Sequence, residues 1–388
     1  MKLEFYKKRR RCVASGAESA ARTEADRPLR RCVYEVRSYV APRQRRMARR
    51  VACKNSDEEM VMEYTTLGRT GLVVSRLALG CMSYGDPAWR SWVLTDDDSQ
   101  PFFRRAIEAG INFFDTSDMY SLGVSEEVTG RALRRYGKLD EIVIATKVHF
   151  PMSAGPNMKG LGRKHIVQAC EASLRRLGVD AIDLYQIHRL DRSVPMDEIL
   201  EALDHLVRSG KVRYLGASTL HGWEFAKALY TSNAHGWARF VSMQNHYNLL
   251  YREEEREMMP LCASEGVGVI PWSPLARGLL AGRPRAQAGA ITPRSAFDAA
   301  SVDYLYDHPT DDAVIDAVRT VAATRALPMA QVALAWLMHR PGVTAPIIGA
   351  TKLAQLDDAI AAMDVRLTPE ECAAMEAPYT AHEVRGWM

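Results

Sequence analysis

The 388-residue sequence lacks several features that mark specialised classes of protein. Its apolar runs all fall short of the roughly 18 residues that a membrane-spanning helix needs, so we expect no association with a membrane. The seven cysteines are scattered, without a CxxC pair or histidines at zinc-ligand spacing, which is typical of reduced thiols rather than of a disulfide framework or a metal site. The sequence therefore predicts a cytoplasmic protein.

Charge is distributed unevenly along the chain. The formal net charge is +4, but residues 1–60 hold 17 Lys and Arg against 8 Asp and Glu, so the remainder is mildly acidic and gives no support to nucleic-acid binding. Residues 1–60 also lack an apolar period and the apolar core of a signal peptide. We interpret them as a basic, disordered extension or as sequence upstream of a later start codon; a nucleic-acid-binding arm and an organellar transit peptide are alternatives.

From residue 64 onward, short β-type runs alternate with amphipathic helical runs. The segment TTLGRTGLVVS predicts a hairpin with Gly68 and Gly71 around its turn. The eight β-type runs that follow are residues 76–80, 111–115, 141–148, 181–188, 212–218, 240–244, 267–273 and 344–350.

Repeated βα units imply a parallel sheet, and eight of them close into a (β/α)8 TIM barrel. We therefore expect an α/β domain over residues 61–388, with an N-terminal hairpin cap and extra C-terminal helices. Residues 276–310 read as a loop, and 311–327 as an extra helix before the regular helix at 329–340. A doubly wound sheet is the alternative, but LALGCMSYG, after the first run, lacks its G-x-G-x-x-G turn.

Catalytic side chains of such barrels project from the C-terminal ends of the strands. The second, third and fourth runs end on Asp115, Lys147 and His188, and Tyr120 lies in the loop after the second run. Helix capping or packing is the ordinary alternative for each of them except Lys147. Because a buried ammonium without a partner is strongly disfavoured, we expect Lys147 to pair with Asp115 on the neighbouring strand.

Together these four side chains suit one reaction class. A free tyrosine has a pKa of about 10, which a nearby ammonium would lower by stabilising the phenolate. An imidazole from the next strand can hydrogen-bond to the same carbonyl oxygen. The set predicts protonation of a carbonyl oxygen while a hydride reaches its carbon, and this chemistry requires no metal.

The segments FFDTSDMYSLGVSEEVTGRAL, VIATKV and DLYQIH resemble the three signatures of the aldo-keto reductase family, and the likeness runs from about Tyr64 to the C-terminus. MQNHYNLLYREEERE, VIPWSPLARG and APIIGATK look most similar to the bacterial YajO-like branch, sometimes named deoxyxylulose-phosphate synthases. The resemblance implies an Asp115–Lys147 ion pair, Tyr120 as general acid and His188 as the residue that orients the carbonyl group of a small-molecule substrate.

The resemblance also implies that NADPH lies across the barrel mouth. The positions that match its contacts, from the nicotinamide to the adenine end, are Ser218, Thr219, Gln244, Trp272, Ser273, Leu275, Gly278, Gly349, Thr351, Lys352 and Gln355. Thr219 departs from the family, in which Asn is common. A helix N-terminus beside Thr351 and Lys352 favours an anion, which predicts a preference for NADPH over NADH.

The substrate pocket is harder to predict. Candidate walls are the aromatic residues after the first and third runs, namely Tyr84, Trp89, Trp92, His149 and Phe150. Such walls suit small aldehydes, α-dicarbonyls and aryl aldehydes. Arg189 would meet an anionic substrate or pair with Asp191. Two other functions stay open: a cofactor-sensing barrel subunit without turnover, and a synthase reaction on a sugar phosphate.

Overall fold

The computed structural model describes residues 49–52, 61–284 and 304–386. Eight parallel strands form its central sheet, in the order β10–β9–β8–β7–β6–β5–β4–β11. Their bounds are β4 Ala78–Gly80, β5 Phe113–Asp115, β6 Val143–Val148, β7 Ile182–Ile187, β8 Val212–Ser218, β9 Phe240–Gln244, β10 Gly268–Val269 and β11 Ile347–Ile348. Each strand lies within one of the eight predicted runs.

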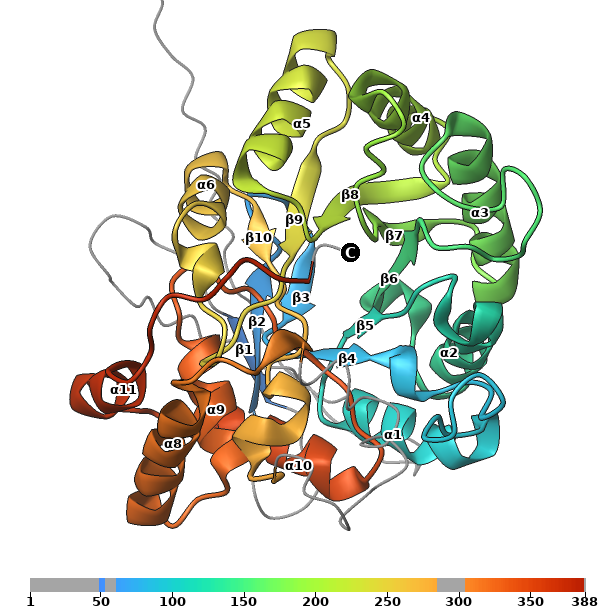
Figure 1. Ribbon diagram of the computed structural model, residues 1–388. Coiled ribbons are helices and arrows are strands. Elements are labelled where there is room, and N and C mark those ends of the chain that lie inside the picture. Colours follow the sequence, from blue (N-terminus) through green and yellow to red (C-terminus); the bar gives the residue numbers. More distant parts are fainter. Residues whose placement is uncertain (1–48, 53–60, 285–303, 387–388) are drawn as a thin grey trace, which may run out of the picture. The chain divides into compact units, whose positions relative to one another are not determined.

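Strands β4 to β10 curve around a common centre (Figure 1), and backbone hydrogen bonds connect the two ends of the sheet so that it curls into a barrel. Thr344 N donates to Val269 O at 2.7 Å, and Ile347 N donates to Pro271 O at 2.9 Å. These loop bonds join β10 to the segment that contains β11. The arrangement confirms the (β/α)8 fold.

Helices follow the strands around the outside of the sheet (Figure 1). They are α1 Asp96–Glu108, α2 Val124–Tyr136, α3 Arg163–Leu177, α4 Met196–Arg208, α5 Gly222–His235, α6 Met258–Glu265, α8 Asp311–Arg325, α9 Met329–Met338, α10 Leu353–Ala361 and α11 Pro369–Glu376. The predicted amphipathic face of α3 is buried at Ile166, Cys170 and Leu177. Helix α8 is the expected extra helix, and α9 is the regular one after it.

Short 3-10 helices occupy several connections. Two of them matter for the site: η2 Tyr120–Gly123 and η5 Ala276–Ala281. Segment η5 lies in the predicted loop 276–310, of which residues 285–303 lie outside the described residues. Among the described residues, no single helix is long and apolar enough to cross a membrane; α8 and α9 satisfy length and composition only as a pair bent by 105°.

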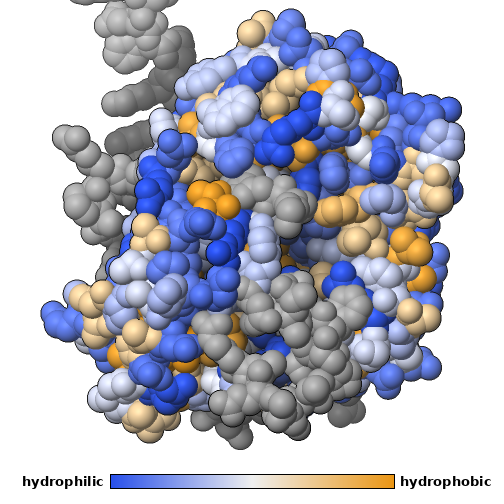
Figure 2. Space-filling model, in the orientation of Figure 1, coloured by the Kyte–Doolittle hydropathy of each residue, from blue (hydrophilic) through white to orange (hydrophobic). Residues whose placement is uncertain are grey.

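Apolar side chains fill the barrel interior and the layer between the strands and the helices. Phe113, Ala145, Leu184 and Ile270 belong to the interior group. A separate cluster packs α8, α9 and η5 together through buried residues such as Trp336. On the face seen in Figure 2, hydrophilic residues predominate and apolar residues form small separate areas.

The N-terminal hairpin is present, with β2 Val61–Thr66 antiparallel to β3 Val73–Ser75 and with Gly68 at φ +60° in its turn. The structure corrects one expectation beside it. Residues 49–52 of the predicted disordered extension form strand β1, Arg49–Ala52, which pairs with β2. This pairing satisfies backbone groups that an exposed edge strand would leave open. The other residues up to 60 lie outside the described part of the chain.

Candidate active site

A buried ion pair lies where β5 and β6 end. Lys147 Nζ is 2.5 Å from Asp115 Oδ1, and the two side chains are 0% and 3% exposed. The ammonium also donates to Thr116 O at 2.8 Å and to Tyr120 Oη at 3.4 Å. The parallel pairing of β5 with β6 places these groups at the same edge of the sheet. Lys147 therefore connects the carboxylate to the phenol.

Tyr120 and His188 complete the cluster. Tyr120 begins η2, in the loop after β5, and its ring meets the His188 ring edge-on at a centroid distance of 5.8 Å. His188 follows β7, and its Nδ1 lies 3.2 Å from Ser117 Oγ. The structure thus brings together all four side chains that the strand ends predicted.

Burial sets the protonation states of this cluster. It lowers the pKa of His188 well below its usual value, and the charges of Lys147 and Arg189 lower it further, so the imidazole is neutral at pH 7. Burial raises the pKa of Tyr120, and Lys147 opposes this effect without cancelling it. The expected net fall in the pKa of Tyr120 is therefore absent. Burial by itself would lower the pKa of Lys147, but Asp115 and Tyr120 raise it, so the ammonium stays charged.

Two glutamines hold the second oxygen of Asp115. Gln186 Nε2 donates to Asp115 Oδ2 at 2.9 Å, and Gln244 Nε2 donates to the same atom at 3.0 Å. The two amides also bond to each other, at 3.1 Å. Gln244 was expected beside the carboxamide of a nicotinamide, and here its amide nitrogen faces Asp115. Gln186 was not predicted, although its position two residues before His188 puts both on one face of the strand.

Several residues assigned to the nicotinamide end of a cofactor lie together at the ends of β8 and β10. Thr219 Oγ1 is 3.3 Å from Ser218 Oγ and accepts from Trp272 Nε1 at 3.3 Å. The indole of Trp272 is stacked on His246 at a centroid distance of 4.3 Å. One face of Trp272 is therefore already covered by a protein side chain.

Strained backbone marks the same edge of the barrel. Eight described residues other than glycine have positive φ, and seven of them lie in loops that follow strands of the central sheet. These seven are Ser121, Leu122, Asn157, Thr219, Ser273, Ala276 and Arg277. Such conformations persist only where the surroundings enforce them, and they cluster at functional sites. Ser273, Leu275 and Gly278, the expected pyrophosphate segment, lie in or beside the last group.

The residues assigned to the adenine end surround the start of α10. Gln355 Oε1 accepts from Thr351 N at 2.9 Å and from Lys352 N at 3.2 Å, so this side chain caps the helix. Lys352 and Gly349 are exposed. The expected contact of Gln355 with an adenine therefore competes with its capping role, whereas the Lys352 ammonium is accessible to an anion.

The expected pocket walls separate into two groups. Trp89, His149 and Phe150 gather around the four-residue cluster: Trp89 lies 6.3 Å from Tyr120, and Phe150 lies 4.8 Å from His188 and 5.0 Å from His149 between ring centroids.

Tyr84 and Trp92 are placed differently. Tyr84 has no exposed area and packs against Phe102 and Phe103 at 5.5 and 5.1 Å, so this predicted wall is a core residue. Trp92 is 6% exposed, with the Arg90 guanidinium 5.9 Å from its ring. Both residues follow β4 in sequence, but the chain turns them inward.

Arg189 does not pair with Asp191 as one expectation held. Its Nη1 donates to His188 O at 2.7 Å, and its Nε is buried without a hydrogen-bond partner among the described residues. Asp191 instead accepts from Leu161 N and from Ser193. The guanidinium lies 5.9 Å from the Phe150 ring, at the border of the four-residue cluster.

A buried lysine–carboxylate pair, a phenol and a neutral imidazole at the C-terminal edge of a (β/α)8 barrel define a proton-transfer site in an α/β enzyme. Comparison with known proteins identifies the family to which this enzyme belongs. The profile of the Aldo/keto reductase family matches residues 76–379.

Individual relatives agree with this match. A versiconal hemiacetal acetate reductase of Aspergillus parasiticus is 44% identical over 336 residues, covering 82% of this chain and 97% of that protein. A putative aryl-alcohol dehydrogenase of Schizosaccharomyces pombe is 41% identical over 347 residues, covering 83% and 97%. Another putative aryl-alcohol dehydrogenase, from Saccharomyces cerevisiae, is 38% identical over 346 residues, covering 84% and 99%.

The chain belongs to the aldo/keto reductase family. It is an oxidoreductase that acts on carbonyl or alcohol groups, and its family generally uses NAD(P)H. These relatives are fungal proteins with reductase or dehydrogenase names. They give no support to the expected likeness to the YajO-like bacterial branch, nor to a synthase reaction.

Proposed function

We propose that the protein is an NADPH-dependent reductase of aldehydes or ketones, with Tyr120 as the general acid. The observation that supports this best is the position of Lys147 Nζ, which contacts both Asp115 and Tyr120 inside a buried site. A buried ammonium stabilises a phenolate more strongly than a solvated one does. Lys147 is therefore placed to stabilise the phenolate that Tyr120 becomes when it gives up its proton.

Each side chain has a separate task. When bound, the reduced nicotinamide supplies a hydride to the carbonyl carbon. The Tyr120 hydroxyl donates its proton to the carbonyl oxygen, and Lys147 stabilises the phenolate that remains. Asp115, held by two glutamines, keeps the ammonium charged and in place. Neutral His188, oriented by Ser117, forms a hydrogen bond to the carbonyl oxygen and fixes its position.

The residues present fit a nicotinamide dinucleotide. The adjacent Ser218 and Thr219 hydroxyls at the end of β8 would hold a carboxamide. The left-handed backbone at residues 276–278 brings main-chain amides into a tight turn suited to a pyrophosphate. The exposed N-terminus of α10, with Lys352 beside it, would receive the 2′-phosphate that distinguishes NADPH from NADH.

Aromatic carbonyl compounds are the substrate class we propose. Trp89, His149 and Phe150 present rings beside Tyr120 and His188, and flat substrates pack well against such walls. The names of two relatives refer to aryl alcohols, the reduced counterparts of aryl aldehydes.

Substitution of Tyr120 by Phe tests this function. We expect kcat for reduction of an aryl aldehyde to fall by about 100- to 10,000-fold, the usual contribution of general acid catalysis. Titration of NADPH against the variant should give nearly the wild-type Kd, because the change removes one hydroxyl from the substrate side. A fall in kcat of less than tenfold would remove Tyr120 from the mechanism.

The same assay with wild-type protein separates the other functions. Turnover of a panel of aldehydes and ketones with NADPH supports a reductase. Tight NADPH binding without turnover of any of them would indicate a cofactor-sensing barrel, and a product formed from a pentose phosphate would indicate a synthase.

A further inference from the structure

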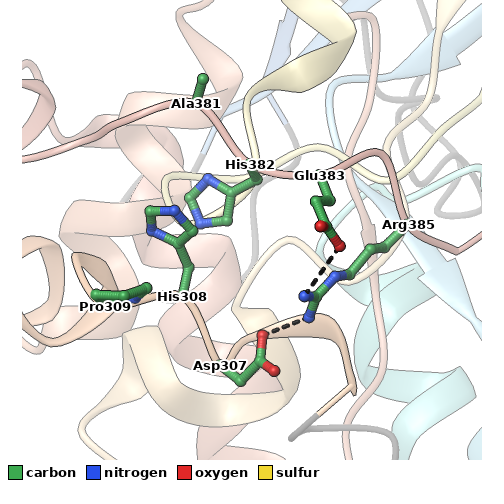
Figure 3. A pocket seen from close by; sticks show the side chains of 7 residues that line it. All are labelled: Asp307, His308, Pro309, Ala381, His382, Glu383 and Arg385. Atoms are coloured by element: carbon green, nitrogen blue, oxygen red, sulfur yellow. Dashed lines mark hydrogen bonds and ion pairs between the residues drawn. The ribbon is translucent and has the colours of Figure 1, made fainter.

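Two histidines and an aspartate meet beside the N-terminus of α8, in a place that the proposed reaction does not use. His308 precedes this helix, Asp311 is its first residue, and His382 comes from the tail that follows α11. One potential ligand atom from each of the three lies within 4.8 Å of the other two. Figure 3 shows the imidazoles of His308 and His382 side by side, and their centroids are 4.0 Å apart.

Burial and hydrogen bonds already order this cluster. The side chains of Asp311 and His382 are 0% and 5% exposed, and His382 Nε2 lies 3.0 Å from Asp311 Oδ1. The other oxygen of Asp311 accepts from His308 N at 3.2 Å. His382 Nδ1 is buried and has no hydrogen-bond partner among the described residues. An imidazole held in this way has one nitrogen whose capacity the protein leaves unused.

The cluster opens onto a cavity of about 270 Å³. Its other lining residues include Asp307, Glu383 and Arg385, and Figure 3 shows the Arg385 guanidinium between the two carboxylates. The positive charge of Arg385 is thus offset by two acidic groups. The cavity leaves space for a water molecule next to the histidines.

We propose that His308, Asp311 and His382 bind a divalent transition-metal ion, with Zn²⁺ as the best match. Two imidazole nitrogens and a carboxylate oxygen are ligands that zinc accepts at about 2.0–2.2 Å, with water in a fourth position. Magnesium and calcium prefer oxygen ligands and suit this set poorly. Tetrahedral bonds of that length put ligand atoms about 3.4 Å apart. His382 Nε2 and Asp311 Oδ1 are already 3.0 Å apart, and one potential ligand atom of each residue lies within 4.8 Å of the others, so small side-chain movements would suffice to hold the ion.

The ion would act on the tail rather than on the reaction. The tail continues from His382 to Arg385, whose backbone exchanges hydrogen bonds with Tyr251 Oη, and to Gly386, where a Cβ atom would lie 3.6 Å from the Trp272 ring. A metal that joins the tail to α8 would therefore hold these contacts in place at the barrel mouth.

Cobalt binding by the full-length, untagged protein tests the proposal. Thiols are first blocked with iodoacetamide, because the seven cysteines also bind such metals. We expect one Co²⁺ per chain, with the strong visible absorption of low-coordinate cobalt, and displacement by Zn²⁺. His308→Gln and His382→Gln should each weaken binding by about tenfold or more.

A matched control and a second measurement make the outcome decisive. His235→Gln alters an exposed histidine that is stacked on Trp237, and it should leave cobalt binding unchanged. For wild type, Zn²⁺ should raise Tm and EDTA should reverse the rise, a readout that remains if a glutamine variant does not fold. The proposal is overturned if wild type binds no Co²⁺ and shows no change in Tm with Zn²⁺, or if the His235 variant loses as much affinity as the other two.

Discussion

The Asp115 carboxylate accepts hydrogen bonds from Lys147, Gln186 and Gln244, so a full negative charge is held inside the barrel by one cation and two amides. The two glutamines cannot neutralise it. The stability of the folded protein therefore depends on the ammonium of Lys147, and this dependence is measurable.

We expect Lys147→Met to lower the free energy of unfolding by roughly 3–5 kcal/mol, the usual effect of removing one partner of a buried ion pair. Adding Asp115→Asn should restore part of this loss, because the unpaired charge disappears. Urea unfolding of both variants measures the difference. Lys138→Met, in the exposed pair with Glu141, is the control and should have little effect. A double variant less stable than Lys147→Met would show that loss of the Lys147–Asp115 ion pair does not account for the lower stability.

The pH dependence of the proposed reaction follows from the two shifted pKa values. Reduction requires protonated Tyr120 and neutral His188. The pKa of His188 lies well below 6.5 and that of Tyr120 above 10, so neither group titrates between them. We expect kcat/KM for reduction to be flat from about pH 7 to 9 and to fall only at higher pH, as Tyr120 loses its proton. An inflection near pH 6.5 that His188→Gln removes would contradict the neutral imidazole.

The titratable members of the site were predictable from the sequence, whereas Gln186 and Ser117, which do not titrate, were not. Asp115, Lys147 and His188 stand out because a charged or titratable group ends an apolar run. Gln186 carries no charge that demands an explanation, and Ser117 resembles any loop serine. The pKa of Tyr120 was misjudged for a related reason: burial depends on the whole fold and here exceeds the effect of one ammonium.

At the scale of elements, two side chains at the N-terminus of α10 have different roles: one caps the helix, and the other is exposed to solvent. Gln355 caps the backbone amides of Thr351 and Lys352, and the Lys352 side chain stays exposed. A lysine at a helix N-terminus opposes the helix dipole, and an anion bound beside it would remove this cost. A capped helix N-terminus with an exposed lysine beside it therefore suits reversible binding of a phosphate group.

We expect Lys352→Ala to raise KM for NADPH by about 10- to 100-fold, because a charge-assisted hydrogen bond contributes roughly 1.5–3 kcal/mol. KM for NADH should change little, since NADH lacks the 2′-phosphate. Initial-rate kinetics with both cofactors measure the split, and Lys164→Ala, an exposed lysine of α3, serves as the control. An equal rise in both KM values would mean that Lys352 does not read the phosphate.

The strands show how well apolar runs in the sequence predict the position and length of strands. Buried parallel strands are mostly apolar, and each of the eight apolar runs contains a strand. The predicted runs 267–273 and 344–350 contain only two-residue strands, because Pro271 and Pro346 have no N–H to donate to the ladder. Strand β1 was missed, since it is bracketed by basic and polar residues and its partner is the hairpin cap rather than the barrel.

At the scale of the whole molecule, the long N-terminal segment contributes β1 to the described structure. We expect removal of residues 1–48 to leave kcat and Tm nearly unchanged. Removal of residues 1–60 also deletes β1 and exposes the edge of β2, so it should lower Tm by a few degrees and favour association between chains. Thermal melts and gel filtration of the two truncations test this. Equal Tm values would show that β1 adds nothing to stability.

The cluster of His308, Asp311 and His382 illustrates what a single sequence conceals at this scale. His382 is 71 residues from Asp311, and neither residue belongs to a spaced metal-binding motif. Only the path of the tail after α11 brings them together.

The few backbone hydrogen bonds that close the barrel between β10 and the segment of β11, here called the seam, have a consequence for local opening of the sheet. Strands β7 and β8 are joined by a long ladder, whereas the seam relies on bonds such as those of Thr344 N and Ile347 N. In hydrogen exchange, these two amides should lose protection before those of β7, through local opening rather than global unfolding. Trp272 and Gly349 flank the seam. A dinucleotide bound there would slow this exchange, and its binding would reversibly stabilise the closed barrel.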